Sequence, residues 1–175
     1  MRFILCFFFL GSIAADVVGQ NFQPVSENSK VGFTIRNFGL KTSGKFSGLT
    51  GNIVFDPVNL NQSSFDVSVS TTTVDTDNNA RDKHLRKSDY FDAANFPTIS
   101  FISKKITTSS LPGRFYVIGT LIIKGKSKEI GFGFSAKQTV VGYIFDGEFN
   151  INRRDFGVGG KSISLSDDVK VSLSI

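Results

Sequence analysis

The sequence predicts an all-β fold, an antiparallel barrel of eight strands with one short helical crossover. Most of the chain after residue 20 alternates apolar and polar residues with a period of two, the pattern of strands that bury one face. Several segments run to ten residues or more, longer than the usual length of about five or six. Long antiparallel strands favour a barrel, because closure removes exposed edges. A sandwich of two sheets is the competing architecture.

Each predicted strand has its own apolar register. Val31, Phe33 and Ile35 share one face of the first strand. The longest such alternating run, which we call an apolar register, covers residues 141–151. The segment 115–123 is apolar on both faces, so we expect that strand to be covered on both sides. Proline and glycine mark several of the turns between strands. The eight predicted strands are 30–37, 45–56, 64–74, 98–106, 114–124, 127–137, 140–152 and 168–175.

The predicted crossover begins with residues that cap helices. The side chains of Asp77 and Asn78 can accept hydrogen bonds from the first free N–H groups of a helix, and residues 80–86 contain good helix formers. Leu85 is the only strong apolar side chain there, so we expect a short helix that lies on another part of the fold and not a core helix. Pro97 then favours an extended chain that leads into the next strand.

The first nineteen residues match a secretory signal peptide. Arg2 supplies a positive charge, residues 3–10 form an unbroken apolar run, and small residues follow. The run is shorter than the roughly 20 apolar residues that a membrane-spanning helix needs. Cleavage after Gly19 is preferred over cleavage after Ala14. We therefore expect a signal peptide at 1–19, one domain at 20–175, and a periplasmic or secreted protein.

Cysteine usage and charge narrow the classes of function. The only cysteine, Cys6, lies in the apolar run, so the domain has no disulfide framework and must be stabilised by burying apolar surface. The formal net charge of +5 is spread along the chain. A nucleic-acid interface needs a dense basic face instead, and we therefore expect no nucleic-acid partner.

Phenylalanine dominates the predicted interior. Of the nineteen phenylalanines, four lie within residues 3–9 and fifteen lie in the domain, which contains no tryptophan. The interior of an eight-stranded barrel can be filled by side chains or can hold one small ligand. Rings interleaved with glycines leave grooves for a flexible aliphatic chain, but the same rings can pack on one another. The residues alone therefore do not decide between a packed core and a ligand-binding cavity.

Few residues offer catalytic or metal-binding chemistry. His84 is the only histidine, and no Ser-His-Asp or Cys-His arrangement is visible, so we expect no enzyme and no catalytic residue. A lone acid–base role for His84 is the alternative. A calcium loop beginning at Asp75 is rejected, because Ala80 stands where glycine is needed and Arg86 where glutamate is needed. We expect no metal site.

Two arginines follow the longest predicted register. The guanidinium groups of Arg153 and Arg154 suit contacts with phosphate. The alternative is an ion pair with Asp155 or with an acid of the crossover.

Several segments carry a resemblance to a known family. They are VGFTIRNFG at 31–39, GKFSGLTGNIVFDP at 44–57, DTDNNARDKHLRKSDYFDAANFPTISF at 75–101, YVIGTLIIKGKSKEI at 116–130 and INRRDFGVG at 151–159. With these segments the domain resembles the YceI family of periplasmic lipid-binding proteins over essentially its whole length. The resemblance implies a lipocalin-like barrel whose long apolar cavity binds polyisoprenoid or related amphiphilic chains. Many members have a histidine where this chain has Asn37, so no role of that histidine carries over.

The resemblance and the aromatic registers together predict a protein that carries or sequesters an isoprenoid or other long-chain lipid. No cofactor is expected beyond a bound polyisoprenoid or quinone-like lipid. A lipid-modifying enzyme that uses His84, and a structural barrel with a filled core, are the alternatives. A transient contact with a membrane or a membrane protein and a homodimer are further expectations.

The predicted ligand site has an apolar wall and a polar mouth. A phosphate or quinone head is expected to meet Arg81, His84, Arg153 or Arg154 at the mouth. The predicted wall is Phe33, Ile35, Phe65, Val67, Phe101, Val117, Phe132, Phe134, Tyr143 and Phe145.

Overall fold

The computed structural model describes residues 20–175. The predicted signal peptide lies outside these residues. No helix within them is both long enough and apolar enough to cross a membrane.

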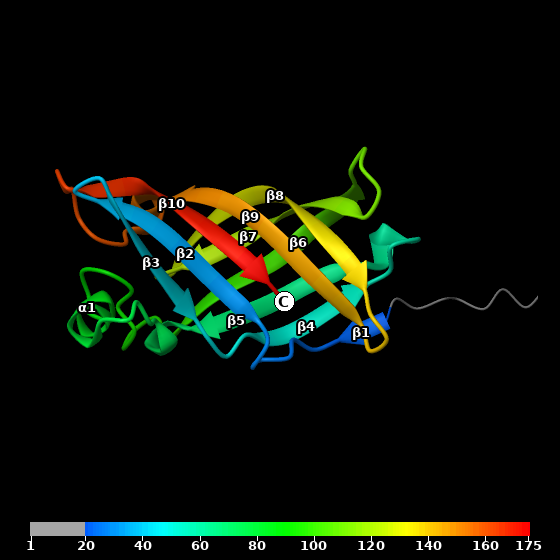
Figure 1. The fold of residues 1–175 in the computed structure, drawn as a ribbon, viewed down its shortest axis with the longest axis horizontal. Helices are drawn as coiled ribbons and strands as arrows, with labels where there is room; N and C mark the ends of the chain where they lie inside the picture. Colours follow the sequence, from blue (N-terminus) through cyan, green and yellow to red (C-terminus); the bar gives the residue numbers. More distant parts are fainter. Residues whose placement is uncertain (1–19) are drawn as a thin grey trace, which may run out of the picture.

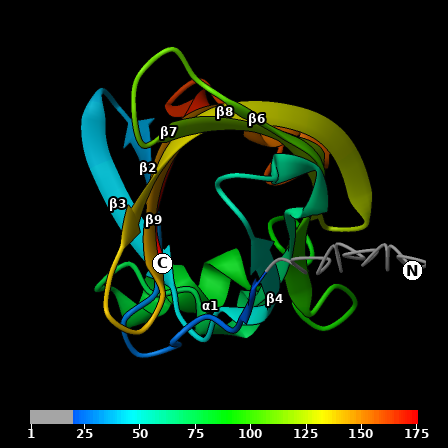
Figure 2. The same cartoon turned by 90° about the vertical axis from the view of Figure 1, so that its right-hand side faces the viewer.

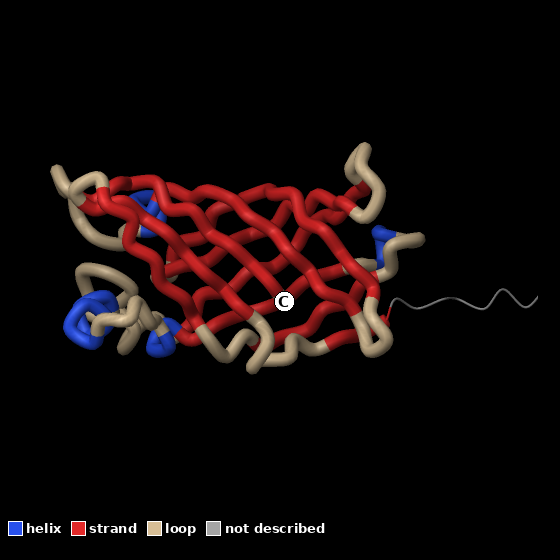
Figure 3. The backbone as a smooth tube through the Cα atoms, viewed as in Figure 1, coloured by secondary structure: helices blue, strands red, loops and turns tan. Residues whose placement is uncertain are grey.

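An antiparallel sheet of ten strands makes up most of the described chain (Figure 1, Figure 3). The neighbours in the sheet follow the order β1-β4-β5-β6-β7-β8-β9-β10-β2-β3. Figure 2 shows how the sheet curls around an interior. The strands are β1 (Gln20–Phe22), β2 (Lys30–Asn37), β3 (Leu40–Phe46), β4 (Thr50–Phe55), β5 (Ser64–Ser70), β6 (Thr98–Thr108), β7 (Arg114–Ile123), β8 (Lys126–Gln138), β9 (Tyr143–Asn152) and β10 (Leu165–Ser174).

The structure confirms the all-β barrel class and corrects the predicted number of strands. The predicted strand 45–56 is two strands, because the backbone turns at Gly48, where φ is +72°. β3 pairs with β2, whereas β4 pairs with β5 and with the short β1, which the sequence analysis missed. The predicted strand 64–74 ends at Ser70, and a 3-10 helix, η2 (Thr71–Thr73), follows. Two further 3-10 helices are η1 (Leu60–Gln62) and η3 (Arg153–Phe156).

The expected cover on both faces of β7 is wrong. Its inward side chains, such as Val117, are buried, but Tyr116 on the outer face is exposed and Ile118 is only half-buried. Apolar residues on both faces of this strand therefore do not indicate a second layer of structure.

The crossover contains the predicted short helix, α1 (Asn79–Leu85), at one end of the barrel (Figure 1). Asn78 caps it, since its side chain accepts a hydrogen bond from the N–H of Arg81 at 3.0 Å. Leu85 packs against a cluster that includes Phe46 and Val74. The helix therefore lies on the barrel end through its one strong apolar side chain, as the sequence predicted.

The crossover also spans the seam of the barrel. β1 and β3 are the two edges of the sheet, and no ladder joins them. Instead, the backbones of Lys45 and Asp75 exchange two hydrogen bonds of 2.8 and 3.0 Å. The hydroxyl of Thr73 donates to the carbonyl of Ser47 at 3.0 Å. Contacts with the crossover thus take the place of strand pairing at this edge.

Aromatic rings fill the end of the barrel away from α1. Phe55, only 1% exposed, lies at their centre. Its ring centroid is 5.1 Å from those of Tyr143 and Phe145 and 5.2 Å from that of Phe115, all in edge-to-face arrangements. Such pairs stabilise a core beyond the burial of their area. We call this group the ring cluster; it consists of Phe55, Phe65, Phe115, Phe134, Tyr143 and Phe145.

We expect Phe55→Ala to lower the free energy of unfolding by about 3–5 kcal/mol, because it empties the centre of the ring cluster. Urea denaturation measures this change. The control Ile102→Ala removes an exposed side chain of β6, and its cost should stay below about 1 kcal/mol. Similar losses in both variants would contradict the central role of the ring cluster.

A second prediction concerns the seam. The N–H of Asp77 and the ammonium group of Lys45, 3.3 Å away, hold the pKa of Asp75 below its usual 3.8. A lowered pKa in the folded state stabilises the fold above the unfolded pKa, and this contribution is lost as the pH falls through the folded value. Asp75→Asn should therefore lower Tm slightly at neutral pH.

In strong acid the wild type and Asp75→Asn should unfold at the same temperature. Thermal unfolding as a function of pH measures this, with Asp66→Asn, an exposed change on β5, as the control. A difference between wild type and Asp75→Asn that persists unchanged in acid would show that the charge of Asp75 is not its cause.

Candidate functional site

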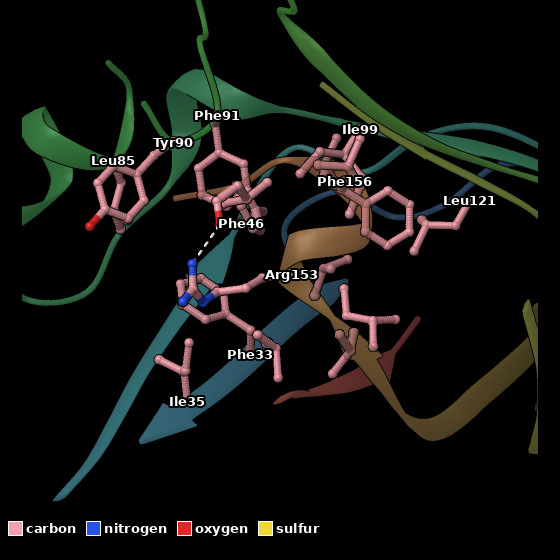
Figure 4. Close-up of a pocket in the computed structure, with 18 of the residues that line it drawn as sticks. Phe33, Ile35, Phe46, Leu85, Tyr90, Phe91, Ile99, Leu121, Arg153 and Phe156 are labelled. Carbon is pink, nitrogen blue, oxygen red and sulfur yellow. Dashed lines mark hydrogen bonds between the residues drawn. The ribbon is translucent and has the colours of Figure 1, made fainter. Parts of the chain in front are cut away.

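The end of the barrel next to α1 holds a cavity of about 420 Å³ (Figure 4). This volume lies within the range of about 300–1,000 Å³ that is typical of ligand pockets. Its wall is mostly apolar, and β2, β6, β7 and β10 all contribute inward side chains to it. The barrel is therefore filled at one end and hollow at the other.

Aromatic side chains separate the cavity from the ring cluster. Phe132 stacks on Phe149 with ring centroids 4.4 Å apart, and it lies 5.6 Å from Phe101. All three line the cavity. The ring of Phe101 lies over Gly119 of β7, where a side chain would collide with it. That glycine allows the ring to approach the neighbouring strand closely.

The structure divides the ten predicted wall residues into two groups. Phe33, Ile35, Val67, Phe101 and Phe132 line the cavity. The other five belong to the packed end: Phe65, Val117, Phe134, Tyr143 and Phe145. All ten lie on inward registers, but the period-two pattern gives the face of a strand and not the depth along the barrel.

Other lining residues were missed by the sequence analysis. Phe149 and Ile151 belong to the register over 141–151 that was already recognised, so that register could have found them. Val171 and Leu173 likewise lie on the inward face of β10. Tyr90 and Phe91 come from the crossover, whose sequence carries no periodic signal.

Arg153 is a buried structural side chain at the rim of the cavity. It is only 4% exposed, and its five N–H donors meet five acceptors. The acceptors are the carbonyl oxygens of Val158, Gly160, Leu165 and Ser166 and the carboxylate of Asp167, at 2.8–3.4 Å. The guanidinium group therefore holds the loop between η3 and β10 in place.

The partner of the two arginines differs from the one expected. The sequence analysis offered Asp155 or an acid of the crossover, but Asp167 at the start of β10 pairs with both. Arg154 is exposed, 3.9 Å from Asp167, and it is not among the cavity-lining residues. The β10 strand begins before the predicted residue 168, and this extension brings Asp167 beside η3.

Arg81 and His84 lie together on α1 and both line the cavity. Arg81 donates from Nε and Nη2 to the hydroxyl and carbonyl oxygens of Thr76, and the Thr76 hydroxyl donates in turn to Asp82. Nη1 of Arg81 makes no hydrogen bond with the residues described. The exposed ring of His84 lies 4.8 Å from that of Tyr90. These two side chains offer positive or hydrogen-bonding groups at a polar rim.

Lys124 connects the two sides of this rim. Its ammonium group donates to the carbonyl of Ser88 at 2.5 Å and to that of Gly157 at 3.1 Å, and so joins the crossover to the loop after η3. Among residues 20–175, no group of three or more His, Cys, Asp or Glu side chains is placed to hold a metal ion. The arrangement suits binding of an amphiphile: an apolar tail inside and a polar head at the rim.

Comparisons with known proteins show which sequences and structures this chain is similar to. A family model described as the YceI-like domain matches residues 22–175. A UPF0312 protein of Vibrio cholerae is 31% identical over 118 residues, which cover 67% of this chain and 62% of the relative. The matched segment thus spans less than two thirds of that relative. A UPF0312 protein of Shewanella denitrificans is 25% identical over 93% of this chain and 86% of its own length.

Three solved structures share the fold. BcnA of Burkholderia cenocepacia has a TM-score of 0.80 at 25% identity, covering 85% of this chain and 95% of its own. The YceI protein of Campylobacter jejuni has a TM-score of 0.67 at 29% identity, covering 75% of this chain and 81% of its own. A polyisoprenoid binding domain of Saccharophagus degradans has a TM-score of 0.70 at 12% identity, covering 89% and 96%. At 12% identity the likeness concerns the fold alone.

The hydrogen-bond network of Arg153 leads to a prediction about stability. Arg153→Met should lower the free energy of unfolding by about 3–5 kcal/mol, because it leaves buried acceptors without donors. The control Arg154→Met removes the exposed neighbour and should cost no more than about 1 kcal/mol. Urea denaturation of both variants measures the difference. Equal, small losses would show that the loop does not depend on the Arg153 network.

Proposed function

The chain belongs to the YceI-like family, and on that premise we propose that it binds a long-chain amphiphilic lipid of the isoprenoid class and carries or sequesters it. The observation that carries this proposal is the apolar cavity beside α1. Its wall combines aliphatic side chains with aromatic rings. A polyisoprenoid binding domain with the same fold supports the choice of ligand class.

The physical basis of binding is the burial of apolar surface, not a chemical reaction. Each methylene group removed from water contributes about 0.8 kcal/mol, against the cost of ordering the chain and losing its free motion. Family membership favours this role over an enzymatic one, and the lone His84 supplies no second catalytic group.

The head of the lipid is proposed to meet the polar rim at Arg81 and His84. Both side chains line the cavity. Nη1 of Arg81 has no hydrogen-bond partner among the described residues, so it can donate to a phosphate or carbonyl oxygen of the ligand. Arg153 already uses all its donors within the protein. It is therefore assigned to hold the rim, and Arg154 lies beyond the lining. A periplasmic or secreted location is part of the proposal and rests on the predicted signal peptide. The homodimer stays a prediction.

The test is native mass spectrometry of protein purified without detergent, together with thermal shifts on adding a polyprenyl phosphate. A bound lipid mass, or a rise in Tm with the added isoprenoid, is expected. Val171→Trp should fill the cavity and weaken binding at least about tenfold, because added bulk displaces the ligand. The control Ile102→Trp adds the same ring on the outside of β6 and should bind as the wild type does.

Two outcomes would refute the lipid-binding proposal. One is a wild-type protein that carries no lipid and shows no thermal shift with long isoprenoids. The other is equal binding by the wild type and a folded Val171→Trp variant, since the ligand would then lie outside the cavity.

A further inference from the structure

We propose that three loop side chains beside the cavity mouth dock the protein on the surface of an anionic phospholipid membrane. They are Phe38 in the β2–β3 turn, Leu40 at the start of β3 and Ile163 in the loop before β10, and we call them the rim tips. The inference rests on the proposed function, because a membrane is the source of the apolar ligand and the rim tips lie where the ligand would enter.

The rim tips are apolar and point into solvent. Phe38 is 81% exposed, Leu40 is 74% exposed and Ile163 is fully exposed. A single exposed apolar residue needs no explanation, but a group of large ones marks an interaction site.

Phe38 is also in an unfavourable backbone conformation. It has φ of +49° and Gly39 has φ of +77°, in a two-residue turn that pairs Asn37 with Leu40. Such turns favour Asn or Asp followed by Gly, and a bulky residue at positive φ is an outlier. Neither the stability of the turn nor burial within the protein accounts for a phenylalanine here. An apolar environment supplied from outside does.

The rim tips lie next to one another and to the cavity. The N–H of Phe38 donates to the carbonyl of Ser164 at 2.8 Å, which ties the turn to the loop that carries Ile163. Asn37, Ser162 and Ser164, their neighbours in the chain, line the cavity. The turn and the loop lie at the same end of the barrel as α1 (Figure 1). An apolar chain that leaves the cavity on this side passes the rim tips.

The charge around the rim tips selects an anionic partner. Arg36, Lys41 and Lys161 are exposed in the same two segments. Neither 36–41 nor 157–164 contains an acidic residue. Apolar tips between basic residues suit the interface of an anionic bilayer. A stable protein interface needs a patch of about 800 Å² on each partner, and three tips on two narrow loops do not form such a patch.

The absence of tryptophan from the chain allows a direct test. Phe38→Trp gives the protein a unique fluorophore at a rim tip. Val140→Trp places one on an equally open turn, between β8 and β9, at the opposite end of the barrel (Figure 1). With lipid-free protein and vesicles of phosphatidylglycerol and phosphatidylcholine, the emission of Phe38→Trp should shift to the blue and that of Val140→Trp should not. No shift for Phe38→Trp, or equal shifts for both, would overturn the proposal.

Vesicle co-sedimentation separates the apolar and the charged contributions. The triple variant Phe38→Ser, Leu40→Ser, Ile163→Ser should bind the anionic vesicles at least about tenfold more weakly, whereas Val140→Ser, Val141→Ser should bind as the wild type does. Lys41→Glu and Lys161→Glu should each weaken binding about fivefold or more, and added salt should weaken binding of the wild type. Equal binding to phosphatidylcholine vesicles would overturn the choice of an anionic surface.

Two separate assays distinguish a failure of the docking proposal from a failure of the lipid-binding proposal. Vesicle binding is measured on lipid-free protein, and cavity binding is measured without vesicles by native mass spectrometry. A triple variant that keeps its cavity ligand but loses vesicles supports docking at the rim tips. A wild-type protein that binds lipid in its cavity but does not bind vesicles would overturn only the docking proposal. A dimer in solution that the triple variant abolishes would show that a second copy, and not a membrane, covers the rim tips.

Discussion

The meeting of aromatic rings at one end of the barrel decides what the other end can do. Around Phe55, rings from facing strands are long enough to touch across the interior, and they bury Phe55 to 1% exposure. Toward α1, many inward positions carry shorter aliphatic side chains such as Ile99, Leu121 and Val171, which do not reach the opposite wall. The same barrel is therefore solid over one part of its length and hollow over the other.

Polar side chains hold the open end in shape. Arg153 fixes the loop between η3 and β10 through five acceptors, and Lys124 joins that loop to the crossover. Thr76, Asp82 and Arg81 form a further network at the start of α1. Hydrogen bonds to charged groups are among the stronger ones in proteins. A rim held in this way keeps the cavity accessible, so that a ligand meets a preformed site and loses less entropy on binding.

The sequence predicted the face of each strand better than it predicted position along the barrel. Alternation identified both Phe33 and Phe145 as inward residues, yet one lines the cavity and the other packs in the ring cluster. Depth depends on the register between strands, and register is set by turns such as Phe38-Gly39 and by partners far along the chain. The cap at Asn78 and the anchor Leu85 could be predicted because they are local features. The Asp167 partner of Arg153 could not, because the thirteen residues between them carry no periodic signal.

The barrel has a seam between β3 and the crossover, where no ladder of strand pairs closes the wall. Its circumference, and so the shape of the ligand it can hold, is therefore not fixed to a single value. Between β3 and the crossover the join consists of hydrogen bonds at Lys45–Asp75 and Ser47–Thr73, the Lys45–Asp75 ion pair, and the packing of Phe46 on Val74 and Phe91. Parting this join breaks fewer backbone hydrogen bonds than separating two of the long central strands, so it is a place where the wall can spread. A bulky or branched ligand can be accommodated by opening this seam, while the rest of the sheet keeps its pairing.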